Sequence, residues 1–144
     1  MSKFVVLAIV LIALIAFMAG PLARSEKAKK LKLIADRFGS RDQLNPENFY
    51  ETYFAGQGYA RETVLGIREV LEQILDSDLS FLSDSDDFSK NLSFFWDFDS
   101  MANVELVQAL EERFKIRIDD SEAEATKTVR QLVELVHAKT TAVT

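Results

Sequence analysis

Ser100 is the residue of this sequence best placed for covalent chemistry. The chain has no cysteine and one histidine, His137, which lies near the C-terminus and which we expect on the surface. Ser100 follows Asp99 at the start of an amphipathic segment, and no base lies beside it. A serine without a neighbouring base is a poor nucleophile, so the sequence disfavours an enzyme that acts on its own. The hydroxyl is instead a suitable attachment point for a group that another enzyme adds.

The segment after Ser100 has the pattern of a helix over residues 100–114. Its core stripe is predicted to contain four apolar residues, Val104, Val107, Leu110 and Phe114. The opposite face is predicted to carry three acidic residues and two others, Glu105, Glu111, Glu112, Ala102 and Gln108. The ordinary interpretation is a solvated face, with Ser100 as the helix N-cap and Asp99 as a second cap. No metal-ligand spacing, glycine-rich phosphate loop or catalytic triad is visible in the sequence.

A longer pattern around Ser100 resembles the acyl carrier proteins, whose usual motif is Gly-x-Asp-Ser-Leu followed by an acidic helix. Here the motif reads Asp99, Ser100 and Met101, with methionine in place of leucine. The next helix matches in Val104-Glu-Leu-Val107 and Ala109-Leu-Glu-Glu-x-Phe114. The family's third-helix region and fourth-helix start are similar to Ile116-x-Ile118-Asp-Asp-x-Glu122-Ala-Glu124 and to Thr128-Val129. The resemblance covers residues 61–138.

This resemblance implies an all-α, four-helix bundle that is a carrier and not an enzyme. It implies a 4′-phosphopantetheine arm on Ser100, whose thiol holds acyl or related intermediates as thioesters for fatty-acid, lipid or polyketide-type biosynthesis. Asp99 would assist docking or metal binding during the transfer, and Met101 would lie beside the arm. A phosphodiester at a helix N-terminus would also meet the positive end of the helix dipole.

The resemblance also implies a set of partner enzymes. These are a phosphopantetheinyl transferase, which would activate the hydroxyl with Mg²⁺, and acyl-loading, acyl-transfer or synthase enzymes with basic surfaces. Such surfaces would recognise Glu105, Glu111 and Glu112, and the contacts would set association rate and partner choice more than affinity. Ala102 and Gln108 replace residues that are often acidic and apolar in the family, which suggests a narrower or different set of partners.

The sequence departs from the family pattern just before Ser100. Phe88-x-x-Asn91-Leu92 is followed by an aromatic insertion of four residues, and the family's glycine is missing. The aromatic residues of this segment, Phe94, Phe95, Trp96 and Phe98, either pack in the core or contact a partner or membrane. These departures support an alternative from another class: an unmodified, carrier-like interaction module that recruits a protein partner to the membrane.

The N-terminal segment has the length and composition of a transmembrane helix. Residues 4–23 carry no charge, and about twenty helical residues span the roughly 30 Å hydrocarbon core. A cleaved signal peptide is the competing interpretation, although a single Lys3 precedes the apolar run and Pro21 lies close to any cleavage point at Ala23. Seven Lys and Arg residues within 24–41 predict, by the positive-inside rule, a single-pass inner-membrane protein with a cytoplasmic C-terminal domain.

The sequence therefore predicts four regions: a transmembrane anchor (1–23), a juxtamembrane region (24–60), a carrier-like domain (61–138) and a tail (139–144). The juxtamembrane region contains a basic helix over 24–38 that Gly39 ends, a linker over 39–45 and an aromatic helix over 45–55. That aromatic helix carries Phe49, Tyr50, Tyr53 and Phe54. It either packs on the carrier-like domain or forms a lid over an acyl pocket.

The carrier-like domain is predicted to contain helices over 61–75 and 100–114, a short helix near 120–125 and a last helix capped by Thr128, without β-strands. Four apolar residues of the long loop 76–99 are expected to plug the core: Leu79, Leu82, Phe88 and Leu92.

Charge is divided unevenly along the chain. Residues 1–41 have a net charge of +6 and residues 42–144 a net charge of −12, which together give the −6 of the whole chain. The acidic part argues against nucleic acid as a partner, whereas the basic part favours anionic lipid.

Overall fold

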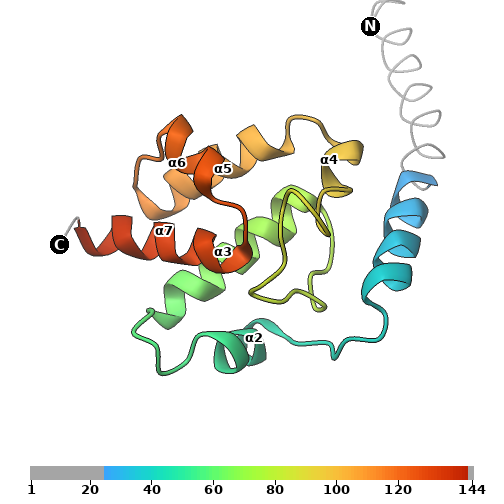
Figure 1. Ribbon diagram of the computed structural model, residues 1–144, viewed down its shortest axis with the longest axis horizontal. Coiled ribbons are helices and arrows are strands. Elements are labelled where there is room, and N and C mark those ends of the chain that lie inside the picture. Colours follow the sequence, from blue (N-terminus) through green and yellow to red (C-terminus); the bar gives the residue numbers. More distant parts are fainter. Residues whose placement is uncertain (1–24, 143–144) are drawn as a thin grey trace, which may run out of the picture. The chain divides into compact units, whose positions relative to one another are not determined.

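The computed structural model describes residues 25–142, which form helices joined by loops (Figure 1). Within these residues there is no β-strand, and the one isolated β-bridge joins Asp87 to Thr128. The chain divides into two compact units, of which one ends at Ser40 and the other begins at Arg41. The prediction of an all-α fold is confirmed for the described part of the chain.

In the first unit, residues 25–38 are helical, in agreement with the predicted basic helix over 24–38. Gly39 follows this helix, and its backbone N–H donates to the carbonyl of Ala35 at 3.0 Å. None of the helices in residues 25–142 combines the length and apolar character that a membrane crossing requires. The predicted transmembrane segment, 1–23, lies outside the described residues.

The second unit begins with the aromatic helix α2, Pro46–Tyr53. Its start follows the sequence signals, because the side chain of Asn45 accepts a hydrogen bond from the N–H of Asn48 at 2.8 Å and Pro46 occupies the first turn. Phe49 and Phe54 are buried, and the guanidinium of Arg68 in the next helix lies over the Phe49 ring. These contacts confirm that the aromatic residues pack on the carrier-like helices.

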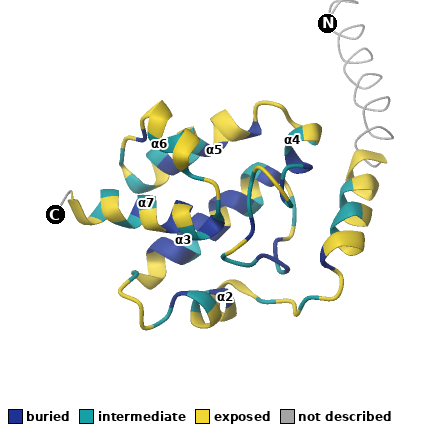
Figure 2. Cartoon of the chain, in the orientation of Figure 1, coloured by how far each residue is buried: buried dark blue, intermediate teal, exposed yellow. Residues whose placement is uncertain are grey.

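Helix α3, Arg61–Leu75, runs through the middle of this unit and contacts α2, α5 and α7 (Figure 1). Its bounds are those predicted from its apolar stripe, and it carries buried residues along most of its length (Figure 2). A side chain on Gly66 would place its Cβ 2.9 Å from Cζ of Phe114. The glycine therefore permits the close approach of α5 to α3.

Three further helices complete the bundle: α5 (Ala102–Phe114), α6 (Asp120–Ala125) and α7 (Val129–Ala142). Helix α6 begins with a capping box of Asp119 and Glu122, and none of its residues is buried. Thr128 caps α7 as predicted, because its hydroxyl accepts from the N–H of Gln131 at 3.1 Å. The predicted core residues of α7 are all buried, namely Val129, Leu132, Val133 and Val136.

The predicted core stripe of α5 is wrong at Val104, which is 43% exposed. The buried residues of α5 are instead Ala102, Leu106 and Leu110, which follow one another at intervals of four along a single line of the helix. Ala102 was expected on the outer face, whereas it is 1% exposed. The helix is thus rotated about its axis relative to the sequence prediction. As a result, Val104 lies at the surface of the bundle instead of in its core.

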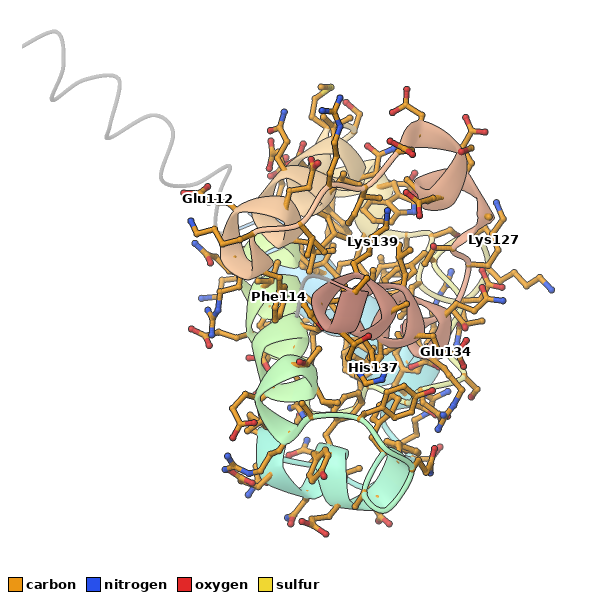
Figure 3. All side chains as sticks on the ribbon, turned by 90° about the vertical axis from the view of Figure 1, so that its left-hand side faces the viewer. Glu112, Phe114, Lys127, Glu134, His137 and Lys139 are labelled. Atoms are coloured by element: carbon orange, nitrogen blue, oxygen red, sulfur yellow. The ribbon has the colours of Figure 1, made fainter. Side chains whose placement is uncertain are left out.

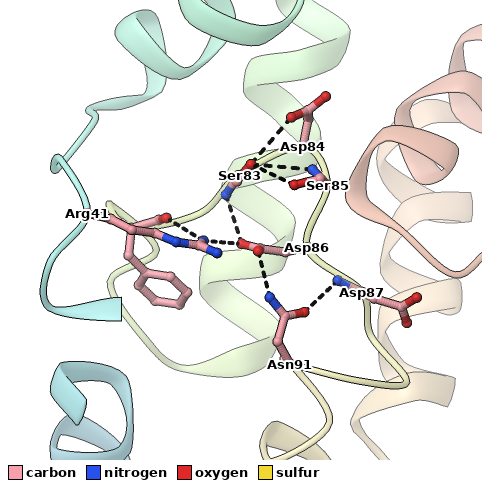
Figure 4. Close-up of polar contacts among 8 residues, drawn as sticks. Arg41, Ser83, Asp84, Ser85, Asp86, Asp87 and Asn91 are labelled. Carbon is pink, nitrogen blue, oxygen red and sulfur yellow. Dashed lines mark hydrogen bonds and ion pairs between the residues drawn. The ribbon is translucent and has the colours of Figure 1, made fainter. Parts of the chain in front are cut away.

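The loop between α3 and α5 contains a short helix, α4 (Phe95–Phe98), that the sequence did not predict. Leu79, Leu82 and Leu92 are buried as expected, whereas Phe88 is only half-buried. A buried carboxylate holds this loop together (Figure 4). Asp86 accepts hydrogen bonds from the Arg41 guanidinium, the Ser83 N–H and the Asn91 side chain, at 2.8–2.9 Å.

Candidate functional site

Ser100 lies in an exposed turn immediately before α5. Asp99 holds this turn, because its Oδ1 accepts from the N–H of Met101 at 3.0 Å and its carbonyl accepts from the N–H of Ala102 at 3.1 Å, whereas the N-cap of α5 is Met101. The Ser100 hydroxyl makes no hydrogen bond to any residue within 25–142. The interpretation of Ser100 as a side-chain cap is therefore not met, and α5 begins two residues later than predicted.

The surroundings of Ser100 suit a bulky attached group. The side chain of Met101 is 54% exposed next to it, and Val104 is exposed in the first turn of α5. The first turn of a helix presents the positive end of its dipole, which favours a negatively charged phosphate at this place. Accessible space, an unengaged oxygen and a favourable field therefore coincide at Ser100.

The three acidic residues of α5 differ in their engagement. Glu105 and Glu112 are exposed, and Figure 3 shows Glu112 directed away from the bundle. Glu111 is half-buried, and its carboxylate accepts a hydrogen bond from the N–H of Ile118 at 3.2 Å. The predicted recognition set is thus divided into two exposed carboxylates and one that also holds the segment before α6.

A groove of about 460 Å³ lies beside α5. Its lining comes from α4, α5, α6, α7 and the loop before α4, and its apolar residues include Phe88, Trp96, Val104, Val107, Leu132 and Leu135. Its polar lining includes Asn103, Gln108, Asp120 and Thr126. The volume lies within the roughly 300–1,000 Å³ range of pockets for small ligands. Sequence reasoning did not locate this groove, because its residues come from several helices and loops that are separate along the chain.

Helix α5 lines the groove and begins two residues after Ser100. Val104, which lines the groove, is the third residue of α5 and therefore lies close to Ser100 along the chain. No residue of α2 lines the groove, so the aromatic helix does not act as its lid in this structure. His137, predicted on the surface, is half-buried on α7, with its ring 5.1 Å from that of Tyr59 (Figure 3).

Comparison with known proteins gives a consistent result. Residues 66–136 match the family described as "Phosphopantetheine attachment site". The chain is 42% identical over 72 residues to the acyl carrier protein of Cyanidioschyzon merolae, which covers 45% of this chain and 79% of that protein. It is 36% identical over 77 residues to the acyl carrier protein of Helicobacter hepaticus, covering 54% of this chain and 96% of that protein. A Caulobacter vibrioides acyl carrier protein is 36% identical over 74 residues, covering 51% and 90%.

The chain belongs to the acyl carrier protein family. Acyl carrier proteins are carriers and not enzymes, and their prosthetic group is a covalently attached 4′-phosphopantetheine. The family works with synthases, acyltransferases and phosphopantetheinyl transferases in general. The matched segment lies inside the predicted carrier-like region 61–138, and it includes Ser100 and the groove-lining residues from Phe88 to Leu135.

Proposed function

We propose that this chain is a membrane-anchored acyl carrier protein that carries acyl or related intermediates as thioesters on an arm joined to Ser100. The observation that carries this proposal is the exposed Ser100 hydroxyl, which makes no hydrogen bond within residues 25–142, while Asp99 holds the turn before α5. A serine needed for capping would lose that hydrogen bond on modification, and the helix would lose stability with it. Modification of Ser100 breaks no such hydrogen bond.

The residues around Ser100 fit the roles that the arm requires. The bound prosthetic group supplies a terminal thiol that holds the cargo as a thioester. Ser100 provides the oxygen to which the phosphate is joined, and the start of α5 offers the positive end of its dipole to that phosphate. Asp99 keeps the turn in shape, and Met101 offers an exposed apolar surface next to the arm. Fatty-acid, lipid and polyketide-type biosynthesis are the pathways in which such a cargo is used.

The groove beside α5 is the site we assign to the acyl chain. Its walls are lined by apolar residues, among them Val104, Val107 and Leu132. Removing a methylene group from water into such walls gains about 0.8 kcal/mol. A chain attached near Val104 enters the groove at little cost in translational freedom, because its tether already holds it there.

We assign enzyme recognition to the exposed acidic side of α5. Glu105 and Glu112 are exposed and make no ion pair with any residue within 25–142, and the whole segment 42–144 has a net charge of −12. Complementary basic surfaces on a phosphopantetheinyl transferase and on acyl-loading or synthase enzymes would accelerate encounter through this charge.

Intact-mass analysis tests the attachment site. The full-length chain is coexpressed with a phosphopantetheinyl transferase, and we expect one added prosthetic group that is absent from Ser100→Ala. Ser121→Ala is the matched control, since Ser121 is also an exposed serine in the first turn of a helix. Loss of the added mass in the control, or its retention in Ser100→Ala, would contradict the assignment. An unmodified native chain would favour the interaction module instead.

Membrane attachment is the second part of the proposal. It is supported by the uncharged run 4–23 and by the basic residues that follow it within 24–41. By the positive-inside rule these charges place the carrier domain in the cytoplasm, on the side where coenzyme A and acyl-transfer enzymes occur. The basic segment would in addition attract anionic lipids, by roughly 1 kcal/mol for each Lys or Arg close to the surface.

Fractionation of cells that express the full-length chain tests this part. We expect the protein in the membrane pellet after washing with alkaline carbonate, with its N-terminal residues retained in the intact mass. Protease should digest the carrier domain only after the inner membrane is opened. A mature chain that lacks residues 1–23 would support the signal-peptide interpretation and exclude the anchor.

A further inference from the structure

The aromatic segment before Ser100 forms one wall of the groove. Trp96 on α4 lines the groove together with Phe88, and the centroids of their rings are 6.2 Å apart. The indole Nε1 of Trp96 donates a hydrogen bond of 2.8 Å to the carbonyl oxygen of Phe88. Ring packing and this hydrogen bond together fix the direction of the indole, since a buried tryptophan N–H needs such a partner.

The residues on both sides of this wall are anchored. Phe94 and Phe95 are buried, and their rings stack with centroids 4.3 Å apart. On the other side, the N–H of Phe88 donates to the carbonyl of Lys127 at 2.8 Å, next to the bridge between Asp87 and Thr128. We therefore expect Phe88 and Trp96 to keep their positions when an acyl chain occupies the groove.

The polar network of Asp86 provides a second support for the same wall. Asn91 donates to the Asp86 carboxylate and accepts from the N–H of Asp87 through its other side-chain atom, both at 2.8 Å (Figure 4). The residues from Asp86 to Asn91 thus form a closed turn that carries Phe88. A rigid turn of this kind holds the Phe88 carbonyl in position for the indole.

We propose that Trp96 sets the length of the acyl chain that the groove accepts. This inference rests on the proposed function and deepens it, because it names a specificity-determining residue for the cargo. Tryptophan is the bulkiest side chain, so its replacement enlarges the groove. Apolar pockets discriminate between chains that differ by one methylene group by roughly 10-fold or more. The aromatic segment that departs from the family pattern is then a part of the cargo site.

The native chain itself contains the probe for the first test. Trp96 is the one tryptophan of the sequence, so intrinsic fluorescence reports on this wall alone. The full-length chain is placed in phosphatidylcholine vesicles and loaded with saturated acyl groups from butyryl to palmitoyl. We expect the emission to shift to shorter wavelength and acrylamide quenching to fall with chain length until the groove is full. Identical fluorescence in the unacylated form and in all acyl forms would overturn the inference.

Variants of α4 provide the second test. For Trp96→Ala we expect the acyl chain that raises the melting temperature most to be longer than in the native protein. Trp96→Phe should give an intermediate length, and it keeps the test decisive if the alanine variant does not fold. Phe98→Ala is the matched control, because Phe98 is a half-buried aromatic residue of the same helix that does not line the groove. An unchanged length profile in both Trp96 variants would overturn the inference.

The two proposals fail in different ways. If intact mass shows no prosthetic group on Ser100, the carrier assignment fails and the acyl series cannot be made on the native chain. If the group and its acyl forms are present but Trp96 does not respond, the carrier assignment stands and the role of Trp96 is refuted. Insertion of the acyl chain into the lipid bilayer would produce this second result.

Discussion

Asp99 and Ser100 are adjacent, but the structure gives them different tasks. The carboxylate of Asp99 satisfies the N–H of Met101, and the Ser100 hydroxyl remains exposed without a bond to the described part of the chain. The sequence permitted either residue to act as the cap, because aspartate and serine are both frequent in that position. The backbone conformation of the turn decides whether the Asp99 carboxylate or the Ser100 hydroxyl accepts a backbone hydrogen bond. The local sequence does not predict that conformation.

Replacement of the Asp99 side chain should destabilise the start of α5. We expect Asp99→Ala to lower the free energy of unfolding by about 1 kcal/mol, since one hydrogen bond to a backbone N–H is lost. Asp99→Asn retains an acceptor and should lose less. Urea denaturation followed by circular dichroism measures both changes. Equal stability of the alanine variant and the native protein would show that the turn holds without this carboxylate.

At the scale of single elements, α6 is attached to the rest of its unit by polar contacts. Its six residues include no buried one, and Glu122 connects it to α7 through a 2.7 Å ion pair with Lys139. The hydrogen bond from Lys139, with a second from the N–H of Asp119, holds the pKa of Glu122 below its usual value of 4.5. This carboxylate therefore stabilises the folded state in its ionised form.

The stabilisation by Glu122 should depend on pH with a definite sign. Because the folded-state pKa is lowered, the contribution is present above pH 4.5 and is lost as the pH falls through the folded-state pKa. We expect hydrogen exchange of the α6 amides to accelerate over that acidic range in the native protein and to be already faster at neutral pH in Glu122→Gln. Glu134→Gln, an exposed position on α7, should leave exchange unchanged (Figure 3). A control that accelerates equally would contradict this assignment.

The bounds of the long helices were largely predictable from the sequence, whereas the face that α5 buries was not. α3 has a regular apolar period and its predicted bounds agree with the structure, although Ala60 at its N-cap makes no side-chain hydrogen bond. α7 begins after the predicted Thr128 cap with its predicted core residues buried, but it continues to Ala142, so the prediction of a tail over 139–144 is wrong for most of that segment. In α5 the apolar residues spread over a wide arc, so that the stripe through Leu106 and Leu110 competes with one through Val104 and Val107. Residues of both stripes line the groove, and the sequence of α5 alone does not predict which of them the other helices cover.

At the scale of the whole unit, contacts distant in sequence hold the segments together. Arg130 of α7 donates to the carboxylate of Asp84 at 2.7 Å, the carbonyl of Tyr53 at 2.6 Å and the side chain of Gln57 at 3.0 Å. Its guanidinium also lies 4.8 Å from the ring centroid of Phe54. These partners lie 46 to 77 residues away along the chain, which explains why sequence patterns did not reveal them.

Loss of the Arg130 guanidinium should loosen α2, the long loop and α7 together. We expect Arg130→Met to lower the free energy of unfolding by roughly 2 kcal/mol, because charge-assisted hydrogen bonds to three segments disappear while the packing of the stem remains. Arg130→Lys should recover a part, since lysine keeps the charge but not the fork of donors. Urea denaturation measures the change. Arg117→Met, at an exposed position, serves as the control and should retain native stability.

The absence of buried residues in α6 has a consequence for how a cargo enters and leaves. The side of the groove formed by Phe88 and Trp96 is fastened by hydrogen bonds, whereas α6 opposite rests on a surface ion pair. Segments with few buried contacts open at a small fraction of the global unfolding free energy. We therefore expect α6 to move away from the groove more readily than the side formed by Phe88 and Trp96. Such a movement would let a tethered acyl chain enter or leave the groove while the buried core stays packed.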